Sequence, residues 1–141
     1  TMVWDLRMPL PLLKPTRGWI YWSKGQDGLT MSDGELAWTS ENKPLRAITV
    51  NRASLQGSVH PTQKPIEVMN FCIEWDDNPL TILDTFLGSG STMVAAHQLN
   101  RKCYGMELDP KYCQVIIDRM TKLDPTLSVK INGNEYVKTE E

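Results

Sequence analysis

The sequence predicts an α/β fold built on part of a doubly wound, Rossmann-like sheet, and three consecutive features support this prediction. Residues 81–83 form a short apolar, β-branched run that is typical of a buried strand. Gly88 and Gly90 follow, where the backbone turns sharply and leaves room for a ligand. A second apolar run, residues 103–106, ends on Glu107, 19 residues after Gly88. An acid at the tip of the second strand accepts hydrogen bonds from a ribose diol in such sheets, so the stretch predicts a nucleoside half-site.

The turn itself departs from the common phosphate-binding loops. Met93 stands where the dinucleotide fingerprint has its third glycine, and Ser91 follows Gly90 where nucleoside triphosphatases need a lysine. The half-site is therefore predicted to hold an adenosine moiety with no strong demand for phosphate. A strand, turn and helix that bind no ligand are the alternative. Ser91 and Thr92 are expected to cap the helix that follows.

Local patterns predict the other elements of the chain. Pro65 suits the first turn of a helix, and Asp109 with Pro110 marks the start of another, because proline has no N–H to leave unpaired there. Asn132 and Gly133 suit the tight turn of a C-terminal hairpin. Strands are expected within residues 1–8, 19–22, 35–40 (a strand or a turn), 42–58 and 127–131, and helices over residues 65–75, 91–99 and 110–120.

Composition bounds the classes of protein. The chain has 141 residues, enough for one domain with a real core, and its net charge of −2 gives no global signal for nucleic acid. No apolar run approaches 18 residues and no signal peptide opens the chain, so neither a membrane span nor export is expected. His60 and His97 lie far apart and no metal-ligand spacing is visible, so no metal site is predicted. The three cysteines, Cys72, Cys103 and Cys113, lie in apolar runs and are expected to be buried thiols in a reducing cytosol.

Two groups of residues allow both a structural and a nucleic-acid-binding interpretation. Between residues 43 and 64 the chain has four Lys or Arg residues and no Asp or Glu. Such a stretch is either a solvated loop or a contact for phosphates. Trp19, Trp22 and Trp38 are either core residues or platforms on which bases stack. The four cations are Lys43, Arg46, Arg52 and Lys64.

Three blocks of sequence together resemble the S-adenosylmethionine-binding region of DNA amino-methyltransferases, which methylate adenine at N6 or cytosine at N4. They are His60-Pro61-Thr62-Gln63-Lys64-Pro65, Leu83 to Thr92, and Gly105 to Tyr112. Their order is that of the permuted beta group, in which motif X precedes motifs I and II. Residues 19–24 and 35–40 also resemble phage and prophage members of this group, so the resemblance covers nearly the whole chain.

The resemblance implies a role for individual residues. The turn from Asp84 to Gly90 would be motif I, with Phe86 beside the cofactor and both Gly88 and Gly90 allowing its close approach. Asp84 would hold the methionine amino group, and Glu107 would be the motif II acid on the ribose hydroxyls, where charge-assisted bonds are strong.

The remaining expected site residues lie on either side of the turn. Thr62, Lys64 and Pro65 match motif X, which lies over the methionine end of the cofactor. Asp109 completes the predicted cofactor-binding set. Lys43, Arg46 and Arg52 fall in the target-recognition region and are the predicted contacts to double-stranded DNA.

The chain departs from the family at the catalytic motif, which is Asp, Asn or Ser followed by Pro-Pro and an aromatic residue. No Pro-Pro dipeptide occurs in the sequence. In the permuted order that motif would precede Thr1, on the strand beside the motif I strand. The chain is thus expected to be a C-terminal part of a methyltransferase, with a sheet that lacks the catalytic-motif strand, with no catalytic residue of its own and with no activity alone.

We expect one structural domain: residues 1–58 as the end of the catalytic region and the target-recognition segment, 59–124 as the cofactor half, and 125–141 as a C-terminal strand or hairpin tail. A homodimer or a complementing N-terminal fragment would fill the missing strand, because an unpaired strand edge invites pairing. The expected location is the cytoplasm of a bacterium or a phage-infected cell. Two alternatives are an inactive DNA- or protein-binding remnant and an unrelated nucleotide-binding oxidoreductase.

Overall fold

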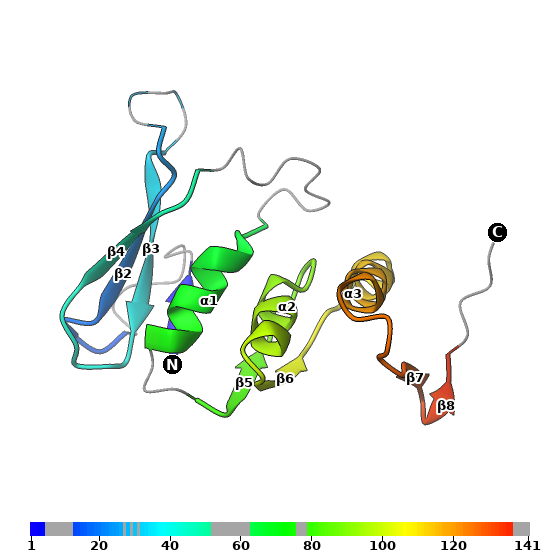
Figure 1. Cartoon of the computed structure of the whole chain (residues 1–141). Helices are drawn as coiled ribbons and strands as arrows, with labels where there is room; N and C mark the ends of the chain where they lie inside the picture. The colour runs from blue at the N-terminus through cyan, green and yellow to red at the C-terminus, as the bar shows by residue number, and fades with distance from the viewer. Residues whose placement is uncertain are drawn as a thin grey trace.

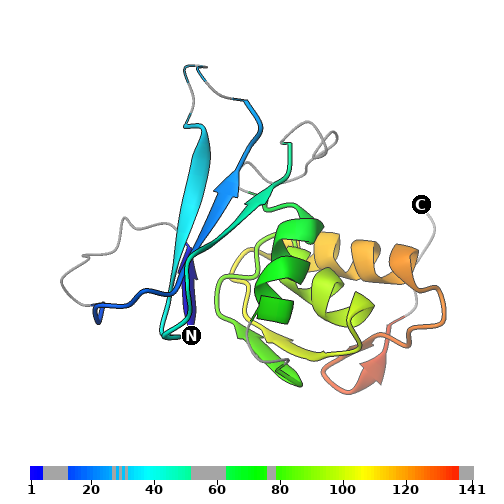
Figure 2. The same ribbon diagram turned by 60° about the vertical axis from the view of Figure 1, so that its left-hand side comes forward.

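The computed structural model describes residues 1–4, 13–26, 28, 30, 32–51, 63–75 and 79–136. The predictions for Arg52, His60 and Thr62 therefore lie outside the described residues. Within these ranges the chain is a mixed α/β structure with a partial, divided sheet, which confirms the predicted fold class. Figures 1 and 2 show two β regions on either side of a central helix.

The N-terminal region is a four-stranded sheet with the order β1-β3-β2-β4. Its strands are β1 (Met2–Trp4), β2 (Trp19–Ser23), β3 (Gly34–Thr39) and β4 (Arg46–Thr49). β3 pairs antiparallel with both β1 and β2, whereas β4 runs parallel to β2. Side chains alternate along a strand, and Ile20 and Trp22 on one face of β2 are accordingly both buried.

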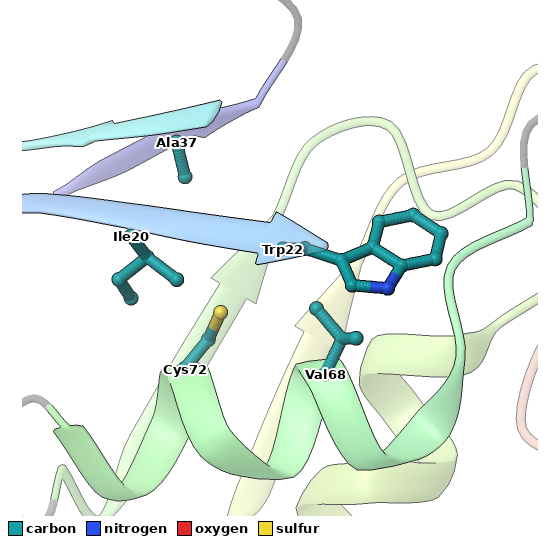
Figure 3. Packing of buried hydrophobic residues seen from close by; sticks show 5 residues of the cluster. All are labelled: Ile20, Trp22, Ala37, Val68 and Cys72. Carbon is teal, nitrogen blue, oxygen red and sulfur yellow. The ribbon is translucent and has the colours of Figure 1, made fainter. Parts of the chain in front are cut away.

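Helix α1 (Ile66–Trp75) covers this sheet and encloses the larger core. Ile20 and Trp22 point from β2 toward Val68 and Cys72 on α1, and Ala37 closes the cluster from β3 (Figure 3). Val68 and Cys72 are four residues apart and so lie on one face of the helix. The indole N–H of Trp22 donates to the carbonyl of Val50 at 2.9 Å, so the ring is buried with its polar group satisfied.

The C-terminal region is built on a parallel pair of strands. β5 (Thr81–Asp84) leads through a turn to α2 (Ser91–Gln98), and β6 (Lys102–Gly105) then pairs with β5. α3 (Pro110–Leu123) follows, and then a hairpin of β7 (Lys130–Ile131) and β8 (Asn134–Glu135). A smaller core of Ile73, Ala95 and Ala96 joins the other side of α1 to α2. Helix α1 therefore contributes to both cores.

The described strands form separate sheets rather than one. Among the described residues, β5 pairs with β6 alone and β1 with β3 alone. The side of β5 away from β6 and the side of β1 away from β3 are thus unpaired within this part of the chain.

Several local predictions need correction. The strand expected within residues 42–58 is only Arg46–Thr49 where the chain is described, and the alternation over 127–131 yields only Lys130–Ile131 as strand. Trp22 and Trp38 are buried core residues, as the structural interpretation had it, and Trp19 is half-buried. All three thiols are free, but Cys72 alone is buried; Cys103 is half-buried and Cys113 is exposed.

None of the described helices is long and apolar enough to cross a membrane.

Candidate functional site

The carboxyl ends of β5 and β6 meet at one edge, and this places the predicted acids together. Asp84, the last residue of β5, is in register with Gly105, the last residue of β6. Two further backbone bonds continue the pairing beyond the strands: Met106 N–H donates to Asp84 O and Leu87 N–H donates to Met106 O, both at 2.9 Å. The turn after β5 and the chain after β6 consequently lie against each other.

Glu107 is bonded directly to the glycine turn. Its Oε2 accepts from the N–H of Gly88 at 2.7 Å, and its Oε1 accepts from the N–H of Asp109 at 2.9 Å. These bonds, that of Asp109 foremost, outweigh partial burial and lower the pKa of Glu107 below its ordinary value. An ionised carboxylate has about four acceptor positions, so Glu107 retains capacity for a ligand's hydroxyl groups.

Asp84 organises the other side of the turn. Its Oδ1 accepts from the N–H of Phe86 at 2.9 Å, and its Oδ2 accepts from the hydroxyl of Thr92 at 2.6 Å. The carboxylate thus ties the end of β5 to the first turn of α2. Each oxygen retains a second lone pair, which leaves Asp84 able to accept from an amine as well.

The glycine turn depends on left-handed backbone at both glycines. Gly88 has φ 54° and Gly90 has φ 82°. A Cβ at Gly90 would lie 2.9 Å from Cγ1 of Ile116 on α3, so the absence of a side chain also permits close packing. Gly90 is the N-cap of α2 and makes no side-chain cap, which corrects the expectation that Ser91 and Thr92 cap this helix.

The segment before α1 docks on the same turn. The hydroxyl of Ser89 donates to Oε1 of Gln63 at 3.0 Å, and the hydroxyl of Ser91 donates to the carbonyl of Lys64 at 2.9 Å. Residues more than 25 positions apart are thereby joined at the turn. Pro65 is buried immediately before α1.

The side chain of Lys64 binds a residue of the N-terminal sheet. Its Nζ lies 2.8 Å from Oε2 of Glu35, whose Oε1 lies 3.1 Å from Nζ of Lys24. Burial opposes ionisation of Glu35, but the hydrogen bonds and charges of the two lysines outweigh it and lower its pKa below the ordinary value of 4.5. Lys64 therefore reaches the turn through its backbone and the N-terminal sheet through its ammonium group.

Exposed apolar residues lie close in the sequence to the two acids. Phe86 is 91% exposed and Leu108 is 98% exposed, and Tyr104 and Met106 are exposed as well. Phe86 belongs to the predicted cofactor site, whereas Leu108, Tyr104 and Met106 were not predicted to be part of it. The signal available in the sequence was their position on either side of Glu107, at the end of a predicted strand.

The predicted DNA-binding residues separate into different environments. Nζ of Lys43 donates to the carbonyl of Trp75 at 3.0 Å and lies 5.3 Å from the centre of its ring. Lys43 thus caps the C-terminal end of α1, a structural role that favourable interaction with the helix dipole explains. Arg46 lies on β4 and is exposed, with a local bond to the carbonyl of Leu45 at 3.3 Å.

Comparison with known proteins identifies the family. The sequence profile of the DNA methylase family, N6_N4_Mtase, matches residues 3–118. The type II methyltransferase M2.LlaDCHI of Lactococcus lactis subsp. cremoris is 38% identical over 65 residues, which are 45% of this chain and 24% of that protein. The chain therefore spans about a quarter of the length of the curated relatives it matches.

Solved structures share the fold. The M1.HpyAVI–SAM complex matches with a TM-score of 0.58 and 27% identity, over 72% of this chain and 60% of that one. The PvuII DNA methyltransferase, described as cytosine-N4-specific, matches with a TM-score of 0.56 and 20% identity, over 79% of this chain and 52% of that one. The second likeness shows the fold alone, and together they confirm the Rossmann-like class. Because the profile covers most of its length, the chain belongs to the DNA methylase family.

Proposed function

We propose that this member of the DNA methylase family supplies the S-adenosylmethionine-binding half of an enzyme that methylates adenine N6 or cytosine N4 in double-stranded DNA. One observation carries the proposal: Glu107 bonds the amide of Gly88 where the carboxyl ends of β5 and β6 adjoin. This is the edge at which open α/β sheets bind nucleosides. The similarity to the M1.HpyAVI–SAM complex supports the same cofactor.

The residues at the turn fit the chemical groups of that cofactor. Glu107 would accept from the ribose hydroxyls, and the exposed ring of Phe86 would contact an apolar face. Asp84 would accept from the methionine amine. When bound, S-adenosylmethionine supplies an electrophilic methyl group, and the protein's contribution is to bind the cofactor and to orient it toward an exocyclic amine. Pro65, Gly90 and Asp109 shape the site through the backbone.

We assign the chain to the permuted beta group, because residues 63–65 precede the turn in sequence and dock on it in space. Residues 1–58 would then belong to the end of the catalytic region, 59–124 to the cofactor half and 125–141 to the tail. We also propose that the chain belongs among the phage and prophage members of this group, which residues 19–24 and 35–40 resemble. Such an enzyme works on DNA in the cytoplasm of a bacterium or an infected cell.

We propose that the catalytic Pro-Pro motif comes from sequence outside these 141 residues, because no Pro-Pro dipeptide occurs among them. The strand that carries it would pair with β5, whose second edge is unpaired in the described chain. A complementing N-terminal fragment or a second copy would fill that place. The purified chain is expected to transfer no methyl group to DNA; methyl incorporation in a preparation free of host enzyme would contradict this.

Calorimetric titration with S-adenosylmethionine tests the cofactor assignment. The Glu107→Ala variant removes charge-assisted bonds and is expected to bind at least about tenfold more weakly than the unaltered chain. Glu74→Ala is the matched control, because Glu74 is an exposed acid in the last turn of α1. If all three proteins bound S-adenosylmethionine with equal affinity, Glu107 would not be a cofactor-binding residue.

The alternative is an inactive remnant that binds DNA, and exposed Arg46 is the described residue that favours it. Binding of DNA that weakens with added salt, without any heat of binding from S-adenosylmethionine, would support the remnant. Titration with NAD in the same buffer addresses the oxidoreductase alternative. The missing third glycine of the dinucleotide fingerprint predicts no NAD binding.

A further inference from the structure

Ser89, between the two glycines of the turn, is a junction of three segments. Nη1 of Arg119 on α3 donates to the carbonyl of Ser89 at 2.5 Å and to its hydroxyl oxygen at 3.1 Å. The same hydroxyl donates to Oε1 of Gln63 at 3.0 Å. Ser89 is only 4% exposed, so these bonds lie in a largely dry environment where an unsatisfied polar group would be costly.

The chemistry of the donors fixes the direction of these bonds. A guanidinium donates and never accepts, so the hydroxyl oxygen of Ser89 must act as the acceptor toward Arg119. The single hydroxyl hydrogen is then left for Gln63. Arg119 therefore orients the hydroxyl of Ser89 for its hydrogen bond to Gln63, which joins the turn to the segment before α1.

Helix α3 is well placed to act as a support for the turn. Ile116 and Arg119 are three residues apart and so lie on the same face of the helix. Ile116 is buried under Gly90, and Arg119 reaches Ser89 beside it. Burial lowers the pKa of Arg119, but a guanidinium remains charged at neutral pH. The helix thus presents one apolar and one charged contact to consecutive residues of the turn.

We propose that Arg119 is a positioning residue for cofactor binding: through Ser89 it holds the glycine turn and aligns Gln63 on it. This inference rests on the proposed function, since the turn matters for binding only if the cofactor occupies it. A guanidinium suits this task because it offers donors in a rigid fork, whereas a lysine offers a flexible point charge. The hydrogen bonds of Arg119 within the described chain go to Ser89, so its effect on the cofactor would pass through the turn.

The test compares Arg119→Met and Arg119→Lys with Lys122→Met. The control removes the same charge from an exposed residue of the same helix. Hydrogen exchange of the ligand-free proteins is the first measurement. Loss of Arg119 is expected to raise amide exchange across residues 87–91 and 63–66 at least about tenfold, while β2 and β3 exchange as before. Arg119→Lys is expected to recover part of the protection.

Titration with S-adenosylmethionine is the second measurement. Arg119→Met is expected to bind about tenfold or more weakly than the unaltered chain, and Lys122→Met to bind equally well. Unchanged exchange at the turn in both Arg119 variants would overturn the inference, whether or not any of the proteins binds the cofactor. A third outcome is possible: Arg119 protects the amides of the turn from exchange, but the unaltered chain binds no S-adenosylmethionine. The proposed function then fails, and the role of Arg119 in cofactor binding is overturned with it.

A variant of Ser89 keeps the inference testable if Arg119→Met does not fold. Ser89→Ala removes the hydroxyl and leaves the carbonyl that Arg119 contacts. Exchange is therefore expected to rise at residues 63–66 more than at residues 87–91. Equal rises in both segments would contradict the role assigned to the hydroxyl.

Discussion

The N-terminal and C-terminal regions use helix α1 in opposite ways. On the N-terminal side, α1 closes a core with β2 and β3 in which Ile20, Trp22 and Val68 are almost inaccessible to solvent. On the C-terminal side it packs on α2, and the parallel pair β5–β6 leaves Leu83 and Tyr104 exposed on its other face. Apolar burial is the dominant stabilising term in folding, so truncation of a buried residue such as Trp22 is expected to cost more than truncation of exposed Leu83.

The C-terminal region compensates with polar connections at its strand ends. Glu107, Asp84, Ser89 and Arg119 together hold a turn that contains two left-handed glycines. Hydrogen bonds shape this turn, and buried Leu87 and Ile116 support it with apolar packing. The candidate site and the larger core are therefore formed by different residues of this chain. A substitution can be chosen to alter either the site or the core.

Truncation of the N-terminal core is the largest expected effect. Trp22→Ala should lower the free energy of unfolding by about 3–5 kcal/mol, because it removes a large buried ring and leaves a cavity. Leu83→Ala, at a residue that is 67% exposed, should change it by about 0.5 kcal/mol or less. Urea unfolding followed by circular dichroism measures both. Similar losses in the two variants would abolish the distinction between the regions.

Thiol reactivity should separate the regions next. Burial raises the pKa of Cys72 to about 12 from an ordinary 9.0, which lowers its thiolate fraction about a thousandfold. Burial, aided by the charge of Asp84, raises the pKa of Cys103 to about 11. Alkylation at pH 8 followed by mass spectrometry should therefore modify exposed Cys113 first, then Cys103, and Cys72 only after unfolding. Early modification of Cys72 would show that the N-terminal core opens readily.

The packing of α3 on the turn is tested with a pair of glycines. Gly90→Ala combines left-handed strain with a contact at 2.9 Å to Ile116, and should cost about 2–3 kcal/mol. Gly133→Ala has a similar φ of 84° but nothing within 4 Å, and should cost about 1–2 kcal/mol from strain alone. Thermal and urea unfolding give both values. An equal cost at the two positions would mean that α3 does not press on the turn.

The connection between the regions through Lys64 and Glu35 should give the smallest effect. Because the pKa of Glu35 is lowered on folding, its ionised form stabilises the native state above pH 4.5, and that contribution is lost as the pH falls below this value. Glu35→Gln should therefore show a shallower loss of stability between about pH 5 and 3 than the unaltered chain. Urea unfolding at several pH values gives the slope of the free energy of unfolding against pH. A steeper slope in the variant would contradict the sign of the shift.

The sequence predicted those features that follow from local spacing. The run of residues 81–83, the glycine pair and Glu107 gave a strand, a turn and an acid whose proximity the structure confirms. Proline after Asp109 correctly marked the start of α3, where the side chain of Asp109 accepts from the N–H of Lys111. The turn at Asn132 and Gly133 was likewise predictable, because both residues tolerate positive φ.

Contacts between distant segments could not be predicted in this way. Lys43 was predicted to contact DNA because it lies in a basic stretch, and that role stays a prediction; the sequence did not reveal that its ammonium group also caps the end of α1. The role predicted for Lys64 at the cofactor stays a prediction; the sequence did not reveal that Glu35, 29 residues earlier, lies 2.8 Å from its ammonium group. Arg119 gave no signal beyond helical spacing, because its partners are the carbonyl and the hydroxyl of Ser89, 30 residues earlier. The identity of a residue indicates what it can bind, whereas tertiary packing decides which partner it meets.

The most direct test of the account is a map of backbone amide chemical shifts on addition of S-adenosylmethionine. We expect the largest changes within residues 84–92 and 105–109, smaller changes at residues 63–65, and almost none in β2 and β3. That result would place the cofactor at the carboxyl ends of β5 and β6, apart from the larger core. Changes concentrated in β2 and β3, or none in a chain shown to be folded, would contradict the account.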